Sequence, residues 1–163
     1  MLDGGEVLID DVSVRENPAG ANTEFIQNGT FQGDTVGAAP LKWRLLGTHG
    51  LHGRTVVATD PDNAANKCLR VVSTGHTDDK HNRIETTFFT GRQVTVGNTY
   101  QISFKARWVS GANAINTRLY FNYLQRTSTL SVGAQWGTPG LANSAAVANA
   151  GPTASGVAHS PAT

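Results

Sequence analysis

Short segments in which apolar and polar residues alternate, separated by turn-forming residues, constrain this sequence more than any other feature. The clearest segment spans residues 100–109, where Tyr, Ile, Phe and Ala alternate with Gln, Ser, Lys and Arg. A period of two is typical of a β-strand with one buried face. Comparable segments occur at 6–14, 25–26, 42–46, 55–58, 68–73, 83–88, 93–96 and 116–125. No window has the apolar stripe of an amphipathic helix, so the spacing predicts an all-β sandwich or jelly roll.

Length and charge narrow the class of protein further. A chain of 163 residues is long enough for one domain with a buried core. Its net charge of +1 gives no broad field for nucleic acid or an anionic membrane, so neither is expected as a partner. The single cysteine, Cys68, excludes an internal disulfide and fits a small buried side chain. No stretch of about 18 apolar residues occurs, so no membrane-spanning helix is expected.

The last part of the chain has a different composition. From about Gly137 it consists mainly of Ala, Gly, Ser, Asn and Pro and contains almost no large apolar residue. Such a segment cannot bury a core of its own. We therefore expect one β domain over residues 1–136 and a linker over residues 137–163, in the form of a disordered or extended C-terminal tail.

Three stretches together resemble a known family. Residues 26–33, Ile-Gln-Asn-Gly-Thr-Phe-Gln-Gly, resemble the opening strand of carbohydrate-binding modules with the galactose-binding-like jelly-roll fold. Residues 97–107 resemble their central strand, with the pattern G-x-x-Y-x-x-S-F-x-A-R. Residues 8–14, Leu-Ile-Asp-Asp-Val-Ser-Val, are similar to their closing strand. The resemblance implies a jelly-roll β-sandwich that binds a polysaccharide or another glycan without catalysing a reaction.

The order of these stretches departs from the family. The closing strand comes last there, whereas here it occupies residues 6–14. Either this segment is left over from a preceding copy, or it completes the sheet as a circular permutation, which costs little because the chain ends of such sandwiches are often close. No second Asp-Asp-Val strand follows Leu124, and without one a sheet edge would stay open. We therefore predict that residues 6–14 pair within the same sandwich as residues 23–126.

Two further resemblances concern the C-terminal part. Residues 137–144 resemble the end of lamin-tail-like domains in large bacterial surface proteins, and residues 151–163 are similar to the lead-in to an immunoglobulin-like repeat. Both imply a long, secreted or cell-surface, multidomain bacterial protein of which this chain is a fragment. Neighbouring domains of that protein are then expected as partners.

The polar side of the predicted strands is the expected ligand-binding face. If the strands at 83–88, 100–109 and 116–125 lie in one concave sheet, their outward side chains combine charged, amide and phenol groups. Planar polar groups bond vicinal hydroxyls in pairs, and an aromatic ring stacks on the apolar face of a sugar. The predicted ligand-binding residues are Arg83, Glu85, Lys105, Arg107, Arg118, Tyr120 and Asn122. The alternative is an ordinary solvated sheet face, which is polar without binding anything.

The resemblance also implies a structural calcium ion near the junction of the opening and closing strands. Calcium prefers about six to eight hard oxygen ligands. Asp10 shares its parity with Val12 and Val14, which predicts an inward carboxylate that needs a partner or a cation. The predicted metal ligands are Asp10, Gln32 and Asp34, with loop carbonyls completing the shell. The alternative is that Asp10 caps backbone amides of the 28–34 turn.

Two other function classes are compatible with the sequence. A structural spacer or adhesion domain would share the fold and lack affinity for sugars. A small hydrolase would need paired carboxylates, for which Glu85 with Asp78 or Asp79 is the candidate, yet acidic residues in such a loop are usually turn formers. No Gly-x-Ser-x-Gly elbow, phosphate-binding loop or Cys-His pattern occurs, so we do not expect an enzyme.

Overall fold

The structure, a computed structural model, describes residues 5–46, 55–73, 83–95 and 97–111, together with the backbone of the strands at 114–121, 124–131 and 157–159. Every regular element in these residues is a β-strand, and all strand pairs are antiparallel. The prediction of an all-β chain is therefore confirmed. Within the described residues, no helix exists that is long and apolar enough to cross a membrane.

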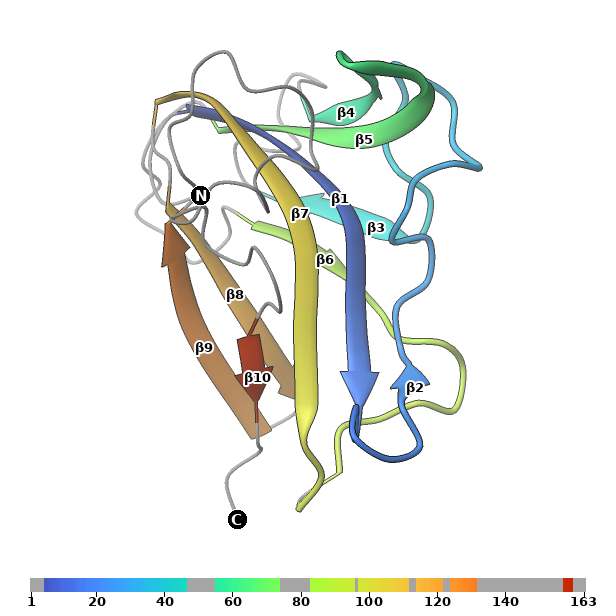
Figure 1. Cartoon of the computed structure of the whole chain (residues 1–163), viewed down its shortest axis with the longest axis vertical. Coiled ribbons are helices and arrows are strands. Elements are labelled where there is room, and N and C mark those ends of the chain that lie inside the picture. The colour runs from blue at the N-terminus through green and yellow to red at the C-terminus, as the bar shows by residue number, and fades with distance from the viewer. Residues whose placement is uncertain are drawn as a thin grey trace.

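The largest sheet has β1 at its centre (Figure 1). Its strands follow the order β10 (Val157–His159), β7 (Tyr100–Gly111), β1 (Gly5–Glu16), β5 (Asn63–Ser73) and β4 (Val56–Asp60), and the short β2 (Thr23–Glu24) also pairs with β1. β1 forms antiparallel ladders with β5 on one side and with β7 on the other. The prediction that residues 6–14 belong to this fold is confirmed, because they form its central strand.

Two small sheets complete the described architecture. β3 (Trp43–Leu46) pairs with β6 (Arg83–Thr86), and β8 (Ala114–Phe121) pairs with β9 (Leu124–Ser131). Trp43 and Ile84 pack against the main core, so the β3–β6 sheet covers one face of the main sheet (Figure 1). β10 lies within the 137–163 segment that was expected to be a linker, and it adds a short edge strand by pairing with β7.

The core lies between these layers and follows the alternation of β7. The buried side chains include Tyr100, Ile102, Phe104 and Ala106, as predicted, together with Val7, Ile9, Val14, Phe25, Phe31 and Leu69. Phe25 packs edge-to-face on Phe88 and Tyr100, with ring centroids 5.1 and 5.6 Å apart. The Tyr100 hydroxyl donates to Glu16 Oε1 at 2.6 Å and accepts from the Thr95 amide at 2.8 Å, so this buried polar group is satisfied.

A β-bulge interrupts the alternation of β1. Asp11 and Val12 together stand opposite the single residue Phe104 of β7, where a regular ladder would place one residue. Asp11 takes a left-handed φ of 50°, and the Val12 amide leaves the ladder to donate to the Gly29 carbonyl at 2.9 Å. The two halves of β1 are therefore out of phase with each other.

The bulge decides which face of the sheet Asp10 occupies. Asp10 pairs with Lys105, whose neighbours Phe104 and Ala106 point into the core, so the side chains of Asp10 and Lys105 lie on the outer face. Beyond the bulge, Val14 points into the core. The expectation of an inward Asp10 in phase with Val14 is therefore wrong. Asp10 is nevertheless buried.

Candidate functional site

Polar and charged side chains from four strands and a turn gather on the outer face of the main sheet. We refer to them as the outer-face cluster, which consists of Asp10, Asp11, Asp60, Asp62, Asn66, Lys105 and Arg107. The ladder between β1 and β7 brings the first members together, because Asp10 pairs with Lys105 and Leu8 pairs with Arg107. The β4–β5 hairpin adds Asp60, Asp62 and Asn66. The cluster thus depends on strand order as much as on local sequence.

Two ion pairs fix the basic side chains of the cluster. Lys105 Nζ lies 2.6 Å from Asp11 Oδ2, and Arg107 Nη1 donates to Asp62 Oδ2. The hydrogen bond to Asp11 raises the pKa of Lys105, so its ammonium stays charged. The four side chains are 30–43% exposed, so solvent screens both pairs and each contributes little to stability. Their effect is to hold a hydrogen-bond donor beside an acceptor at the surface.

Two carboxyl groups of the cluster are buried. Asp10 is 2% exposed and Asp60 is 6% exposed, and Asn66 Nδ2 donates to both, at 3.1 Å to Asp10 Oδ2 and 3.2 Å to Asp60 Oδ2. Asp10 Oδ1 has no hydrogen-bond partner among the described residues. Burial raises the pKa of Asp10 to about 6, and the bond from Asn66 offsets only part of that shift. A proton or a metal ion would be stabilised at this oxygen.

Cys68 forms the apolar floor beside these carboxyl groups. It is fully buried, and it packs with Leu8 against Ala58 and Val109 on the same face of the sheet. Burial raises the pKa of the Cys68 thiol to about 12, and the nearby carboxylates act in the same direction. Without a bound metal ion, the thiol therefore stays protonated at neutral pH.

Hydrogen bonds through Asn66 join Gln32 to Asp10. Gln32 Nε2 donates to Asn66 Oδ1, and the same Asn66 side chain donates to Asp10 and Asp60. The side chains of these four residues therefore form one hydrogen-bonded network on the outer face. Two of the predicted calcium ligands, Asp10 and Gln32, therefore belong to the same network.

Asp34, the third predicted calcium ligand, is used within its own loop. Asp34 Oδ2 accepts from Asn28 Nδ2 at 2.8 Å, and Oδ1 accepts from the Leu41 amide at 3.3 Å. The backbone carbonyls of Gln32 and Asp34 accept from the ammonium of Lys67, at 2.9 Å for Gln32. Around no single point of the described chain do three or more His, Cys, Asp or Glu side chains gather to hold a metal. The free oxygen of Asp10 suits a cation, whereas Asp34 does not.

The seven predicted ligand-binding residues fall into three groups. Lys105 and Arg107 belong to the outer face of the main sheet. Arg83 and Glu85 lie on β6 in the other layer, where Glu85 contacts Arg83 at 2.8 Å and Arg44 at 2.6 Å. Of the remainder, Arg118 and Tyr120 lie on β8 with side chains outside the described residues, and Asn122 is itself outside them. β6 and β7 belong to different sheets, so the single sheet expected to carry all seven residues is not formed.

Sequence reasoning missed Asp11, Asp60, Asp62 and Asn66. The last three come from residues 59–66, which lie between the strands predicted at 55–58 and 68–73. In the structure their turn is tight, because the Asp62 amide donates to Asp60 Oδ1 at 3.0 Å. The Asp-Pro-Asp-Asn composition indicated a turn, but only the pairing of β5 with β1 places that turn beside Asp10.

Comparisons with protein-family models, with curated proteins and with solved structures found no match to this chain. Its function is therefore inferred from the geometry of its own residues.

Proposed function

We propose that this chain is a non-catalytic glycan-binding module with a jelly-roll sandwich, belonging to a larger secreted or cell-surface protein. Its outer face would hold a neutral polysaccharide. The observation that supports this most is the pairing of Lys105 with Asp11 and of Arg107 with Asp62 on one sheet face. Each pair presents a hydrogen-bond donor beside an acceptor, already held in place.

A sugar ring matches such a surface because each of its hydroxyl groups both donates and accepts hydrogen bonds. One hydroxyl of a vicinal pair accepts from the guanidinium of Arg107, while its neighbour donates to the carboxylate of Asp62. Because the ion pairs already restrict these side chains, binding a sugar costs less side-chain entropy. The charges cancel within each pair, which favours a neutral polysaccharide over an acidic one on this face.

A structural spacer is the competing proposal, since a solvated sheet face can carry the same ion pairs without binding anything. Affinity electrophoresis through gels containing xylan, mannan or β-glucan separates the two. We expect retardation in at least one gel, and Arg107→Met should weaken binding roughly tenfold or more, a loss of about 1–3 kcal/mol. Arg44→Met, which breaks an exposed ion pair on the other layer, is the matched control. Equal migration of the unaltered chain in every gel would favour the spacer.

We also propose that a calcium ion binds beside Asp10. The support is the buried Asp10 Oδ1, which has no partner in the part of the chain that the structure describes. A second buried carboxyl, that of Asp60, is joined to Asp10 through Asn66. Carboxyl oxygens of Asp10 and Asp60 would hold the ion, because hard oxygens are the ligands that calcium prefers. The amides of Asn66 and Gln32, whose nitrogens now donate within the network, would turn to present their oxygens. A bound ion would neutralise the buried carboxylates and tie the β4–β5 hairpin to β1.

A further inference from the structure

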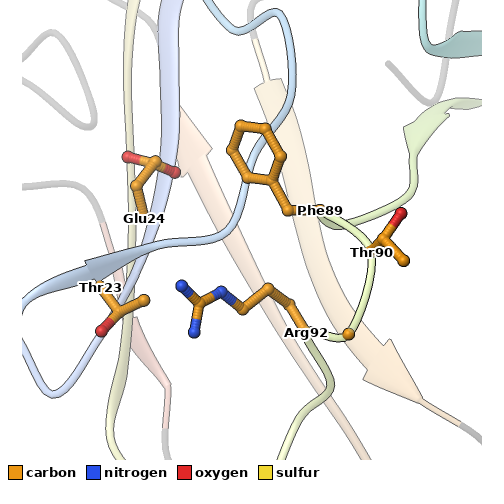
Figure 2. A pocket seen from close by; sticks show the side chains of 6 residues that line it. Thr23, Glu24, Phe89, Thr90 and Arg92 are labelled. Carbon is orange, nitrogen blue, oxygen red and sulfur yellow. The ribbon is translucent and has the colours of Figure 1, made fainter.

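An open pocket of about 490 Å³ lies where β2 meets the turn that follows β6 (Figure 2). It is lined by Thr23 and Glu24 from β2 and by Phe89, Thr90, Gly91 and Arg92 from the turn. β2 pairs with the C-terminal end of β1, whereas β5 pairs with the N-terminal half. β2, which lines the pocket, therefore lies at the opposite end of β1 from the β4–β5 hairpin (Figure 1).

Backbone hydrogen bonds hold the turn in one place. The Arg92 amide donates to the Phe89 carbonyl at 2.9 Å, and Gly91 has a φ of 82°, which is the geometry of a type II turn. The Phe89 amide donates to the carbonyl of the buried Phe25 at 3.0 Å. The side chains of Phe89 and Arg92 are therefore presented from a fixed backbone.

Phe89 places an aromatic ring at the edge of this pocket. The side chain is 46% exposed, whereas the adjacent Phe88 packs on Phe25 in the core. Figure 2 shows the Phe89 ring on one side of the space into which the Arg92 side chain extends. An exposed ring beside polar groups offers a stacking surface for the flat, apolar side of a ligand.

Arg92 has no carboxylate partner among the described residues. Its guanidinium carbon lies 5.8 Å from the centre of the Phe25 ring, which is a cation–π contact, and Figure 2 shows the group extending toward Thr23. The other arginines whose side chains are described all contact a carboxylate, namely Arg15, Arg44, Arg70, Arg83 and Arg107. Among these arginines, only Arg92 has guanidinium N–H groups that no carboxylate occupies, so they are available to a ligand.

Glu24 lines the pocket, but its carboxylate is directed to other groups. Its Oε1 accepts from the backbone amides of Val14, Phe25 and Ile26, at 2.9–3.1 Å. Its Oε2 accepts from the Ser13 hydroxyl and lies 3.6 Å from Arg15. The carboxylate therefore holds β2 on β1 and does not pair with Arg92. The lining as a whole has one acidic and one basic residue, but the guanidinium of Arg92 is left available to a ligand.

We propose that this pocket is a second binding site, which takes a sugar residue bearing a carboxylate, as in a polyuronate. The guanidinium of Arg92 binds the ligand carboxylate, and the ring of Phe89 stacks on the apolar side of the sugar ring. The hydroxyls of Thr23 and Thr90 lie at the same pocket to bond sugar hydroxyls. This site goes beyond the neutral-glycan face and does not depend on it, because the two share no residue.

Isothermal titration of the full chain with polygalacturonate and with alginate tests the proposal. We expect binding to at least one of them, and a loss of at least tenfold when polygalacturonate is replaced by its methyl ester, which keeps the ring and removes the charge. Arg92→Met and Phe89→Ala should each weaken binding at least tenfold. Arg44→Met, which removes an exposed guanidinium elsewhere, should leave it unchanged, and melting curves would show that every variant is folded.

Several outcomes would overturn this assignment. Absence of binding to both polyuronates, equal binding of the esterified polymer, or full affinity in the Arg92→Met variant would each exclude the site. Displacement by sodium acetate as effective as by galacturonate would show that a bare carboxylate suffices and that no sugar ring is recognised. Arg107→Met should leave polyuronate binding intact, so a failure of the neutral-glycan proposal remains distinguishable from a failure of this one.

Discussion

The outer-face cluster and the Phe89–Arg92 pocket each contain a guanidinium and a carboxylate group, and they arrange these groups in opposite ways. In the cluster, the guanidinium of Arg107 has the carboxylate of Asp62 beside it. In the pocket, the carboxylate of Glu24 is directed to backbone amides, and Arg92 is left without one. The direction of each carboxylate decides whether the surface offers a donor paired with an acceptor or a guanidinium without a carboxylate beside it.

Removing β1 should disrupt both regions at once and gives the largest expected effect. β1 supplies Asp10 and Asp11 to the cluster, and it pairs with β2 beneath the pocket. Deletion of residues 1–16 should therefore give insoluble protein or a melting temperature lowered so far that no cooperative transition remains, as monitored by circular dichroism. Deletion of residues 1–4, which precede the strand, is the control. A chain without residues 1–16 that melts normally would contradict the central position of this strand.

Substitution of Gly29 by alanine should have a smaller effect on stability, and it should disturb the cluster by moving the bulge of β1. A Cβ at Gly29 would lie 1.9 Å from the Val12 carbonyl oxygen, so alanine forces the backbone of the bulge to move. We expect Gly29→Ala to lower the free energy of unfolding by about 3 kcal/mol in urea denaturation. Gly33→Ala is the matched control, because a Cβ there meets nothing within 4 Å. Equal stability of the two variants would show that the close approach does not constrain β1.

The buried carboxyl of Asp10 in the cluster predicts that the stability of the fold depends on pH. Burial raises the pKa of Asp10 to about 6, above its ordinary value of 3.8, so the folded chain keeps a proton that the unfolded chain has already released. The contribution of Asp10 to stability is therefore greatest below pH 4, falls between pH 4 and about 6, and is lower by up to about 3 kcal/mol above that range.

Urea titrations of the chain and of Asp10→Asn, carried out with a chelator present, measure this difference. The asparagine variant should lose the decrease between pH 4 and 6, because it has no proton to release. If both proteins show the same pH profile across this range, Asp10 is not the group responsible.

Calcium should stabilise the fold through the cluster, beside Asp10, and not through the pocket. An ion that binds only the folded chain raises its stability by about 2.7 kcal/mol at a hundredfold excess over the dissociation constant. Calcium should therefore raise the melting temperature and a chelator should lower it, whereas Asp10→Asn should respond to neither. Melting curves indifferent to both, together with no metal by elemental analysis, would exclude the ion.

The variant Asp62→Asn should have the smallest effect on stability. It is the most direct test of whether ion pairing separates the cluster from the pocket. Asp62→Asn removes the carboxylate beside Arg107, and because the pair is partly exposed, stability should change by only about 0–1 kcal/mol. If pairing is what separates the two regions, this variant should give the outer face a new affinity for polygalacturonate. The titration is performed with Arg92→Met in the background, so that the pocket does not contribute. No gain in affinity would mean that the shape of the pocket, rather than its unpaired charge, determines what it binds.

Local sequence was enough to predict β7 but not the phase of β1. In β7 the alternation of Tyr100, Ile102, Phe104 and Ala106 is uninterrupted, and all four side chains are buried as expected. In β1 the pair Asp11 and Val12 occupies the space of one residue. No sequence rule for the Asp-Asp-Val triplet indicates such a bulge, because it depends on the hydrogen bond to a residue of a distant turn.

The candidate sites were less predictable than the strands because they depend on strand order. Alternation correctly assigned Lys105 and Arg107 to the face opposite the core, but it carries no information on whether β6 and β7 share a sheet. The pocket was missed for a related reason. The exposure of Phe89 follows from the packing of its neighbour Phe88 on Phe25, which is a contact between distant segments.

The bulge in β1 has a consequence for how a gene encoding this chain can change. Asp10 and Val14 reach opposite faces of the sheet only because one additional residue stands between them. Loss of a single codon at position 11 or 12 would restore a plain alternation and exchange the faces of every residue on one side of it. Evolution can therefore replace residues in this segment more readily than it can shorten or lengthen it, and homologous genes should keep its length fixed even where their codons differ.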